Sequence, residues 1–258
     1  MSLYEEPTGL RAALREIRRL ADTAAQAQPR IAAEPGRLPA FEWDLEQRII
    51  AVLRSHCPGV PVIAEESFTA TGEAGGEGDL RFVLDPIDGS ESYASGSPLY
   101  AVSLALCEHD EPRFGWVYQP SQGTLFTARK AQGAYVNGHR LGRAAVADTL
   151  SVRSTAREDP DVVRFMDSAE RLGFTVEDRM WCSSLKICWV ASGLRAGVVK
   201  TLRRRNGHRT WWGTAAGLLV ALEAGAQALT LAGERWAGQD GNLLIAGSDL
   251  ARGLRESR

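Results

Sequence analysis

Two aspartates three residues apart, Asp85 and Asp88, are the residues of this sequence best suited by type and spacing to metal chemistry. The apolar run Phe82–Leu84 predicts a buried strand with Asp85 at its carboxyl end, and Pro86 is expected to end that strand because proline cannot donate to a sheet ladder. Gly89-Ser90 predicts a turn followed by the start of a helix with free N–H groups. Paired carboxylates beside such a helix start suit a divalent cation next to a phosphate.

The same residues also fit an ordinary Asp-Gly turn between two strands. A second acidic strand end favours the metal interpretation, since the apolar run Val62–Ala64 leads directly into Glu65 and Glu66. Neighbouring residues of a strand point to opposite faces, so one of these two glutamates is expected to face the same cavity as Asp85.

The composition points away from nucleic acid and membranes as main partners. The chain has 258 residues, 44% of them hydrophobic, which suits one large domain or two closely packed ones. A net charge of -2 offers no strongly basic surface. The four cysteines form no C-x-x-C pair and no apolar run reaches membrane-spanning length, so we expect a cytoplasmic protein with reduced thiols.

The secondary-structure elements that must position these residues are predicted to be helices first and antiparallel strands after them. Helical spacing predicts a first helix from residue 10, and three prolines predict a loop over residues 28–40. A second helix is expected to bury Trp43 and to carry Asp44 in its first turn. Four apolar runs between residues 99 and 136 then predict antiparallel strands.

From Thr149 onward, predicted strands alternate with helices at a spacing that suits parallel pairing. This change predicts two domains. Residues 1–148 would form an N-terminal α+β domain that carries the metal site, and residues 149–258 a C-terminal α/β domain that completes the cleft.

Five short motifs follow one another along the chain: Glu65-Glu66-Ser67, Asp85-Pro86-Ile87-Asp88-Gly89-Ser90, Phe114-Gly115-Trp116-Val117-Tyr118-Gln119-Pro120, Gly133-Ala134-Tyr135-Val136-Asn137-Gly138 and Trp212-Gly213-Thr214-Ala215-Ala216-Gly217. In type and order they resemble the inositol monophosphatase superfamily of magnesium-dependent phosphatases. The resemblance implies the sugar-phosphatase fold, an α/β sandwich of αβαβα layers, usually as a homodimer. The stretch 183–188 looks most like the branch that includes 3'(2'),5'-bisphosphate nucleotidases.

Carried over to this sequence, the resemblance implies a site for two or three magnesium ions. Glu65, Asp85 and the Ile87 carbonyl would bind one ion, and Asp85 with Asp88 would bind a second. Two such cations can neutralise phosphoryl oxygens, activate a water molecule and stabilise the leaving group.

The resemblance also implies roles in catalysis and substrate binding. The backbone N–H groups of Gly89 and Ser90 would hold the phosphate. Asp44 would pair with the Ser90 hydroxyl, and this pair together with Glu65 would orient the attacking water. Three further residues are expected to bind the substrate: Ser184, Lys186 and Arg209.

One position departs from the family pattern, because Trp212 is followed by Gly213 where the family has an aspartate that completes the second metal's ligands. Water could fill that gap, with Gly213 serving as a helix N-cap. Alternatively, the second metal binds poorly and catalysis is weak or absent. The basic run 200–209 is either a solvated loop or the source of a guanidinium that occupies the vacated space and binds phosphate.

The sequence therefore predicts a Mg²⁺-dependent phosphomonoesterase that uses metal-activated water. Its substrate would be a small anionic ester: an inositol phosphate, a sugar phosphate or a 3'-phosphoadenosine nucleotide. The alternative is a weakened or inactive relative that binds a phosphorylated ligand or a partner, with Gly213 as the residue that distinguishes the two.

Overall fold

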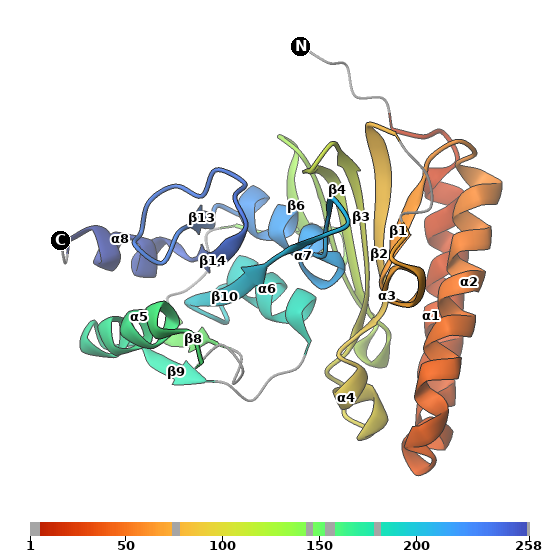
Figure 1. Cartoon of the computed structure of the whole chain (residues 1–258), viewed down its shortest axis with the longest axis horizontal. Coiled ribbons are helices and arrows are strands. Elements are labelled where there is room, and N and C mark those ends of the chain that lie inside the picture. Colours follow the sequence, from red (N-terminus) through yellow and green to blue (C-terminus); the bar gives the residue numbers. More distant parts are fainter. Residues whose placement is uncertain (1–5, 74–77, 143–146, 153–157, 178–181, 257–258) are drawn as a thin grey trace.

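The computed structural model describes residues 6–73, 78–142, 147–152, 158–177 and 182–256. Two β-sheets alternate with helical layers, so that helices cover the outer face of each sheet and fill the space between them (Figure 1). The helices of the three layers are α1 (Leu10–Ala33) with α2 (Leu38–His56), α6 (Ser183–Ala191) with α7 (Trp212–Glu223), and α5 (Pro160–Arg171) with α8 (Ser248–Glu256). This arrangement confirms the predicted αβαβα sandwich.

The first sheet has its seven strands in chain order. They are β1 (Val62–Ala64), β2 (Leu80–Asp88), β3 (Ala101–Glu108), β4 (Glu111–Gln119), β5 (Thr124–Arg129), β6 (Gly133–Val136) and β7 (His139–Arg140). All neighbours are antiparallel except β1 and β2, which the helix α3 (Glu65–Thr71) connects as a parallel pair. The short helix α4 (Ser90–Ala94) follows β2.

The second sheet has the order β13-β14-β10-β8-β9. Its strands are β8 (Thr149–Ser151), β9 (Thr175–Glu177), β10 (Gly197–Leu202), β13 (Gln227–Leu229) and β14 (Gly241–Ala246). A two-stranded hairpin, β11 (Arg204–Arg205) with β12 (His208–Arg209), joins β10 to α7. The division into two domains at residue 148 remains a prediction.

Three apolar clusters hold the layers together. One joins α1 and α2 to the first sheet, one surrounds α6 and α7 between the sheets, and one lies under α5 and α8. The segment Thr214–Ala221 of α7 is buried on every side, which explains why this helix lacks a polar face.

The loop predicted over residues 28–40 is wrong, because α1 continues through Pro29 to Ala33 and α2 begins at Leu38. The buried Gln28 amide donates to the carbonyls of Tyr93 and Ser97 at 3.2 and 2.8 Å, and these contacts hold the last turns of α1 against α4 and the residues after it. Tertiary packing here outweighs the helix-breaking preference of proline.

Candidate active site

The strand β2 brings Asp85 and Asp88 to one cavity. Asp85 pairs with Ser103 and Asp88 with Ala101 of β3, with an irregularity in register between them. Pro86 does not end the strand, contrary to expectation. Pairing with β1 stops at Leu84, so on that side the missing N–H of Pro86 removes no ladder hydrogen bond.

A cavity of about 340 Å³ lies at this end of β2. It is lined by the start of α3, the end of β2, the start of α6, strand β10 and the start of α7. Seven residues expected at the site line it: Glu65, Asp85, Ile87, Asp88, Gly89, Ser90 and Gly213. Of the two adjacent glutamates, Glu65 alone lines the cavity, and it does so as the first residue of a helix rather than as the end of a strand.

Glu65 and Asp85 form a buried pair of carboxyl groups. Burial raises the pKa of Asp85 well above its usual range, and the negative charges of Glu65 and Asp88 raise it further. Burial likewise raises the pKa of Glu65 to about 7, although hydrogen bonds with Asp85 and Trp212 oppose that change. Asp85 Oδ1 is buried without a hydrogen-bond partner. Such a pair needs a shared proton or a cation to offset its charge.

The Asp88 carboxylate is bonded to the start of α6. Its oxygens accept hydrogen bonds from the backbone N–H of Ser183 at 3.0 Å, from the N–H of Ser184 and from Cys182 Sγ at 3.4 Å. These donors, together with the positive end of the helix dipole, stabilise the charge of Asp88.

The carboxyl groups fit one magnesium ion better than two. No group of three or more His, Cys, Asp or Glu side chains is arranged to hold a metal ion within the described ranges. Glu65, Asp85 and the carbonyl of Ile87 offer the oxygen donors that suit a single Mg²⁺, which usually keeps several waters. A second site fits poorly, since Asp88 is bonded to α6 and Gly213 brings no side-chain oxygen.

Gly213 lies against the two aspartates. The Ser103 hydroxyl, opposite Asp85 on β3, donates to the Trp212 carbonyl at 3.0 Å and holds the first residue of α7 over the sheet. A Cβ atom added at Gly213 would lie 3.1 Å from both Asp85 Oδ2 and Asp88 Oδ1. A side chain at the position that departs from the family pattern would therefore contact the predicted metal ligands directly.

The expected pairing of Asp44 with Ser90 is wrong. The Asp44 side chain is 67% exposed and forms an ion pair with Arg48 at 3.7 Å, one turn along α2. Glu42 takes that place: it is buried, and a hydrogen bond with the Ser90 side chain lowers its pKa. Burial, the larger effect, raises the pKa of Glu42 to about 7.

The register of α2 explains the error. The helix begins at Leu38, so its buried face includes Glu42 and Glu46, while Trp43 is 42% exposed rather than buried as expected. Two residues along a helix correspond to about 200° of rotation, so Asp44 points away from the side that Glu42 occupies. An acidic residue four positions after Leu38, within the apolar stripe, was the signal that sequence reasoning missed.

Glu46 positions the start of α3, and hence Glu65. Its fully buried carboxylate accepts hydrogen bonds from the backbone N–H groups of Glu66 and Ser67 at 2.7 and 2.8 Å, and from the Ser67 hydroxyl. A carboxylate at this place satisfies N–H groups that a helix start leaves unpaired.

The turn after Asp88 depends on glycine. Gly89 has a φ of +100°, and a Cβ atom there would lie 3.1 Å from both Cys182 Cβ and the Leu99 carbonyl oxygen. The Ser90 hydroxyl donates to the Ile87 carbonyl at 3.3 Å, and both residues line the cavity.

The substrate-binding roles expected for Ser184 and Lys186 do not match the structure, because both side chains are buried within α6 and neither lines the cavity. Ser184 contributes its backbone N–H to Asp88 instead. Ser183 and Lys200 line the cavity in their place.

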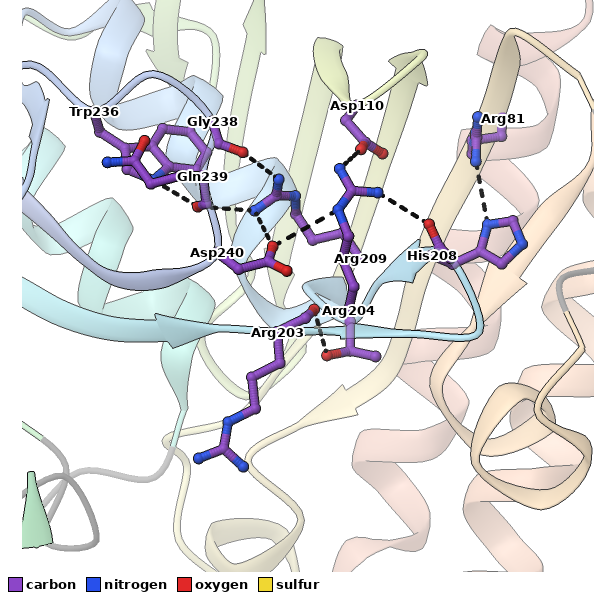
Figure 2. Close-up of polar contacts among 12 residues, drawn as sticks. Arg81, Asp110, Arg203, Arg204, His208, Arg209, Trp236, Gly238, Gln239 and Asp240 are labelled. Carbon is purple, nitrogen blue, oxygen red and sulfur yellow. Dashed lines mark hydrogen bonds and ion pairs between the residues drawn. The ribbon is translucent and has the colours of Figure 1, made fainter.

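Arg209 does not occupy the space next to Gly213 either. Its guanidinium donates to the carbonyls of Gly238 and Gln239, and it pairs with Asp240 at 3.3 Å (Figure 2). The same group lies over two tryptophan rings, with its carbon Cζ 5.4 Å from the centroid of Trp211 and 5.5 Å from that of Trp236. Arg209 is therefore a buried structural cation that fixes the segment 236–240, and its expected role in phosphate binding is wrong.

Comparison with known proteins identifies the family. The inositol monophosphatase family model matches residues 36–258. The chain belongs to the inositol monophosphatase family. Among its relatives, "Fructose-1,6-bisphosphatase/inositol-1-monophosphatase" of Aquifex aeolicus is 30% identical over 212 residues, 79% of this chain and 74% of the relative. "Nus factor SuhB" of Pasteurella multocida is 31% identical over 186 residues, 70% of this chain and 66% of the relative.

Solved structures share the fold of this inositol monophosphatase family member. Inositol monophosphatase-II from Staphylococcus aureus superposes with a TM-score of 0.77 at 18% identity, and the match covers 96% of this chain and 92% of that one. Extragenic suppressor protein suhB from Bartonella henselae gives a TM-score of 0.74 at 24% identity, with 95% and 99% covered. At these identities the likeness establishes the fold alone.

Proposed function

We propose that the protein is a Mg²⁺-dependent phosphomonoesterase that hydrolyses a small anionic phosphate ester. The observation that carries this proposal is one cavity lined by Glu65, Asp85 and Ile87, in which an Asp85 oxygen, Oδ1, is buried without a hydrogen-bond partner. Membership of the inositol monophosphatase family supports the reaction class. Solved structures of SaIMPase-II, which share the fold, have inositol monophosphate or 2'AMP bound, and this supports a small phosphorylated ligand.

Each group has a distinct task in this proposal. Glu65, Asp85 and the Ile87 carbonyl would hold the cation, which when bound polarises a phosphoryl oxygen and lowers the pKa of water. Ser90 is hydrogen-bonded to Glu42, whose pKa of about 7 lets it accept or release a proton near neutral pH. Glu42 and Ser90 would therefore orient the attacking water in place of the Asp44–Ser90 pair. The Gly89 and Ser90 N–H groups remain the proposed phosphate contacts.

The test is turnover by purified protein with magnesium against an inositol phosphate, adenosine 3',5'-bisphosphate and p-nitrophenyl phosphate. We expect phosphate release from at least one ester, and a loss of about 100-fold or more in Asp85→Asn, since a direct ligand is removed. Asp44→Asn is the matched control, because that acidic side chain is exposed on the outer helix.

A Gly213→Asp variant separates the enzyme from an inactive relative that only binds phosphate esters. Turnover by the natural chain supports the proposal, whereas turnover by Gly213→Asp alone would identify it as a weakened family member. If neither protein releases phosphate, the proposed activity is wrong.

Three further features belong to the same proposal. All four cysteines are buried and unpaired, which supports a reducing, cytoplasmic location. No helix in the described part of the chain is long and apolar enough to cross a bilayer. A homodimer is proposed from the family resemblance, and light scattering coupled to size-exclusion chromatography tests it.

A further inference from the structure

One cationic side chain shares the cavity with the carboxylates. Lys200, in the middle of β10, lines the cavity together with Asp85, Asp88 and Gly213. Its ammonium group donates a hydrogen bond to the hydroxyl of Ser183, the first residue of α6. Because the backbone N–H of Ser183 binds Asp88, the Lys200 ammonium and the Asp88 carboxylate meet at the same helix end.

No arginine of the described basic run 203–209 lines the cavity, and three of them contact other groups. Arg204 pairs with Asp110, and Arg209 is bonded to the segment 238–240 (Figure 2). Arg205 lies over the Phe68 ring at 6.0 Å. The Arg203 side chain points away from the Arg204–Arg209 cluster, and Arg203 does not line the cavity. Among the described basic residues of the stretch 200–209, Lys200 is therefore the one that lines the cavity.

A lysine at position 200 is unusual for this chain, which has three lysines among its 30 Lys and Arg residues: Lys130, Lys186 and Lys200. An ammonium group is compact and carries three donors that can reorient between partners. It can therefore bind Ser183 and turn toward phosphate oxygens in the cavity without the fixed planar fork of a guanidinium.

We propose that this cavity takes one divalent cation and that Lys200 supplies, on the phosphate, the positive charge that a second cation would otherwise provide. This inference rests on the proposed function and specifies how its site binds phosphate. Gly213 removes one negative charge and the α6 amides satisfy Asp88, so less positive charge is needed on that side of the cavity. A single ammonium matches that smaller requirement, whereas a second divalent ion would lack ligands.

The test counts metal ions and measures phosphate binding rather than turnover. Metal-stripped full-length protein is titrated with Mn²⁺, with free ion followed by electron paramagnetic resonance, and the Mn²⁺-loaded protein is then titrated with inorganic phosphate by calorimetry. We expect one Mn²⁺ per chain. Lys200→Met should weaken phosphate binding by roughly 10- to 100-fold, the loss of one charge-assisted hydrogen bond, without weakening Mn²⁺ binding.

Two variants make the result specific to this ammonium. Lys130→Met removes the same charge at an exposed site paired with Glu111, away from the cavity, and should bind phosphate as the natural chain does. Lys200→Arg should recover part of the lost affinity, because it restores the positive charge.

Two outcomes would overturn the inference alone: two Mn²⁺ ions per chain, or unchanged phosphate affinity in Lys200→Met. If the natural chain binds neither Mn²⁺ nor phosphate, the proposed function fails together with it.

Discussion

Replacing Glu42 by glutamine tests the electrostatics of the site without any metal or substrate. Glu42 is 6% exposed, and its Oε1 atom is buried without a hydrogen-bond partner. Burial raises its pKa from 4.5 to about 7, with the nearby charges of Glu66 and Glu65 adding to the effect and the Ser90 hydrogen bond opposing it. The folded protein therefore keeps a proton on Glu42 at pH values where the unfolded chain has lost it.

The sign and size of the effect on the free energy of unfolding follow from the difference in the Glu42 pKa between the folded and the unfolded chain. Between about pH 4.5 and 7, loss of the proton favours the unfolded chain, so the stability that Glu42 contributes falls as the pH rises and levels off above 7. At about 1.4 kcal/mol per pH unit, the fall is about 3 kcal/mol at most. Allowing for relaxation of the site, we expect Glu42→Gln to gain about 1–3 kcal/mol relative to the natural chain between pH 4.5 and 8.

The assay is urea-induced unfolding in EDTA across this pH range, followed by circular dichroism. Subtracting the two curves removes most of the contribution of other titrating groups. Glu46→Gln is the matched control, one turn along the same buried face of α2. Because its carboxylate accepts backbone hydrogen bonds from Glu66 and Ser67, it should lose about 1–3 kcal/mol instead. Parallel pH profiles for Glu42→Gln and the natural chain would refute the reasoning.

Three other perturbations are expected to separate structural from functional residues. Asp44→Asn should keep turnover within about twofold, since its exposed pair with Arg48 contributes little; a tenfold loss would contradict the assignment. Arg209→Ala should lower the free energy of unfolding by about 2–4 kcal/mol, because it removes the ion pair with Asp240 and the hydrogen bonds to the Gly238 and Gln239 carbonyls, yet leave phosphate affinity unchanged by calorimetry. Mn²⁺ affinity should rise with pH through about 7, as the Glu65–Asp85 pair, in which the pKa of both groups is raised, loses its protons, whereas a flat profile by calorimetry would contradict the raised pKa.

Patterns local to one segment were predictable from the sequence. The Asp85–Ser90 motif, the strand before it and the layered fold all follow from residue type, spacing and family resemblance. Gly89 illustrates why: its positive φ and its tight contacts leave no room for a side chain, so the motif carries its own geometry.

The burial and contacts of side chains that depend on helix register or on distant segments were not predictable in the same way. Asp44 and Glu42 are two residues apart, and only the packing of α2 on the sheet decides which of them is buried. Arg209 follows a basic run that looks solvated, but the carbonyls that bind it come from a segment about 30 residues later. Lys200 reaches the cavity because β10 pairs with β14 and β8, a contact that no local pattern contains.

The departure at Gly213 is best understood as part of one charge balance. A side chain there would lie 3.1 Å from both Asp85 and Asp88, so an aspartate would add a third negative charge to an already crowded pair. Two divalent ions could offset that charge, whereas the site proposed for the natural chain has Glu65 and Asp85 to share one ion. With Asp88 bonded to α6 and Lys200 at the same helix end, the remaining charges can be balanced by one cation and one ammonium. Gly213→Asp is therefore expected to demand more metal, and in EDTA it should be less stable than the natural chain.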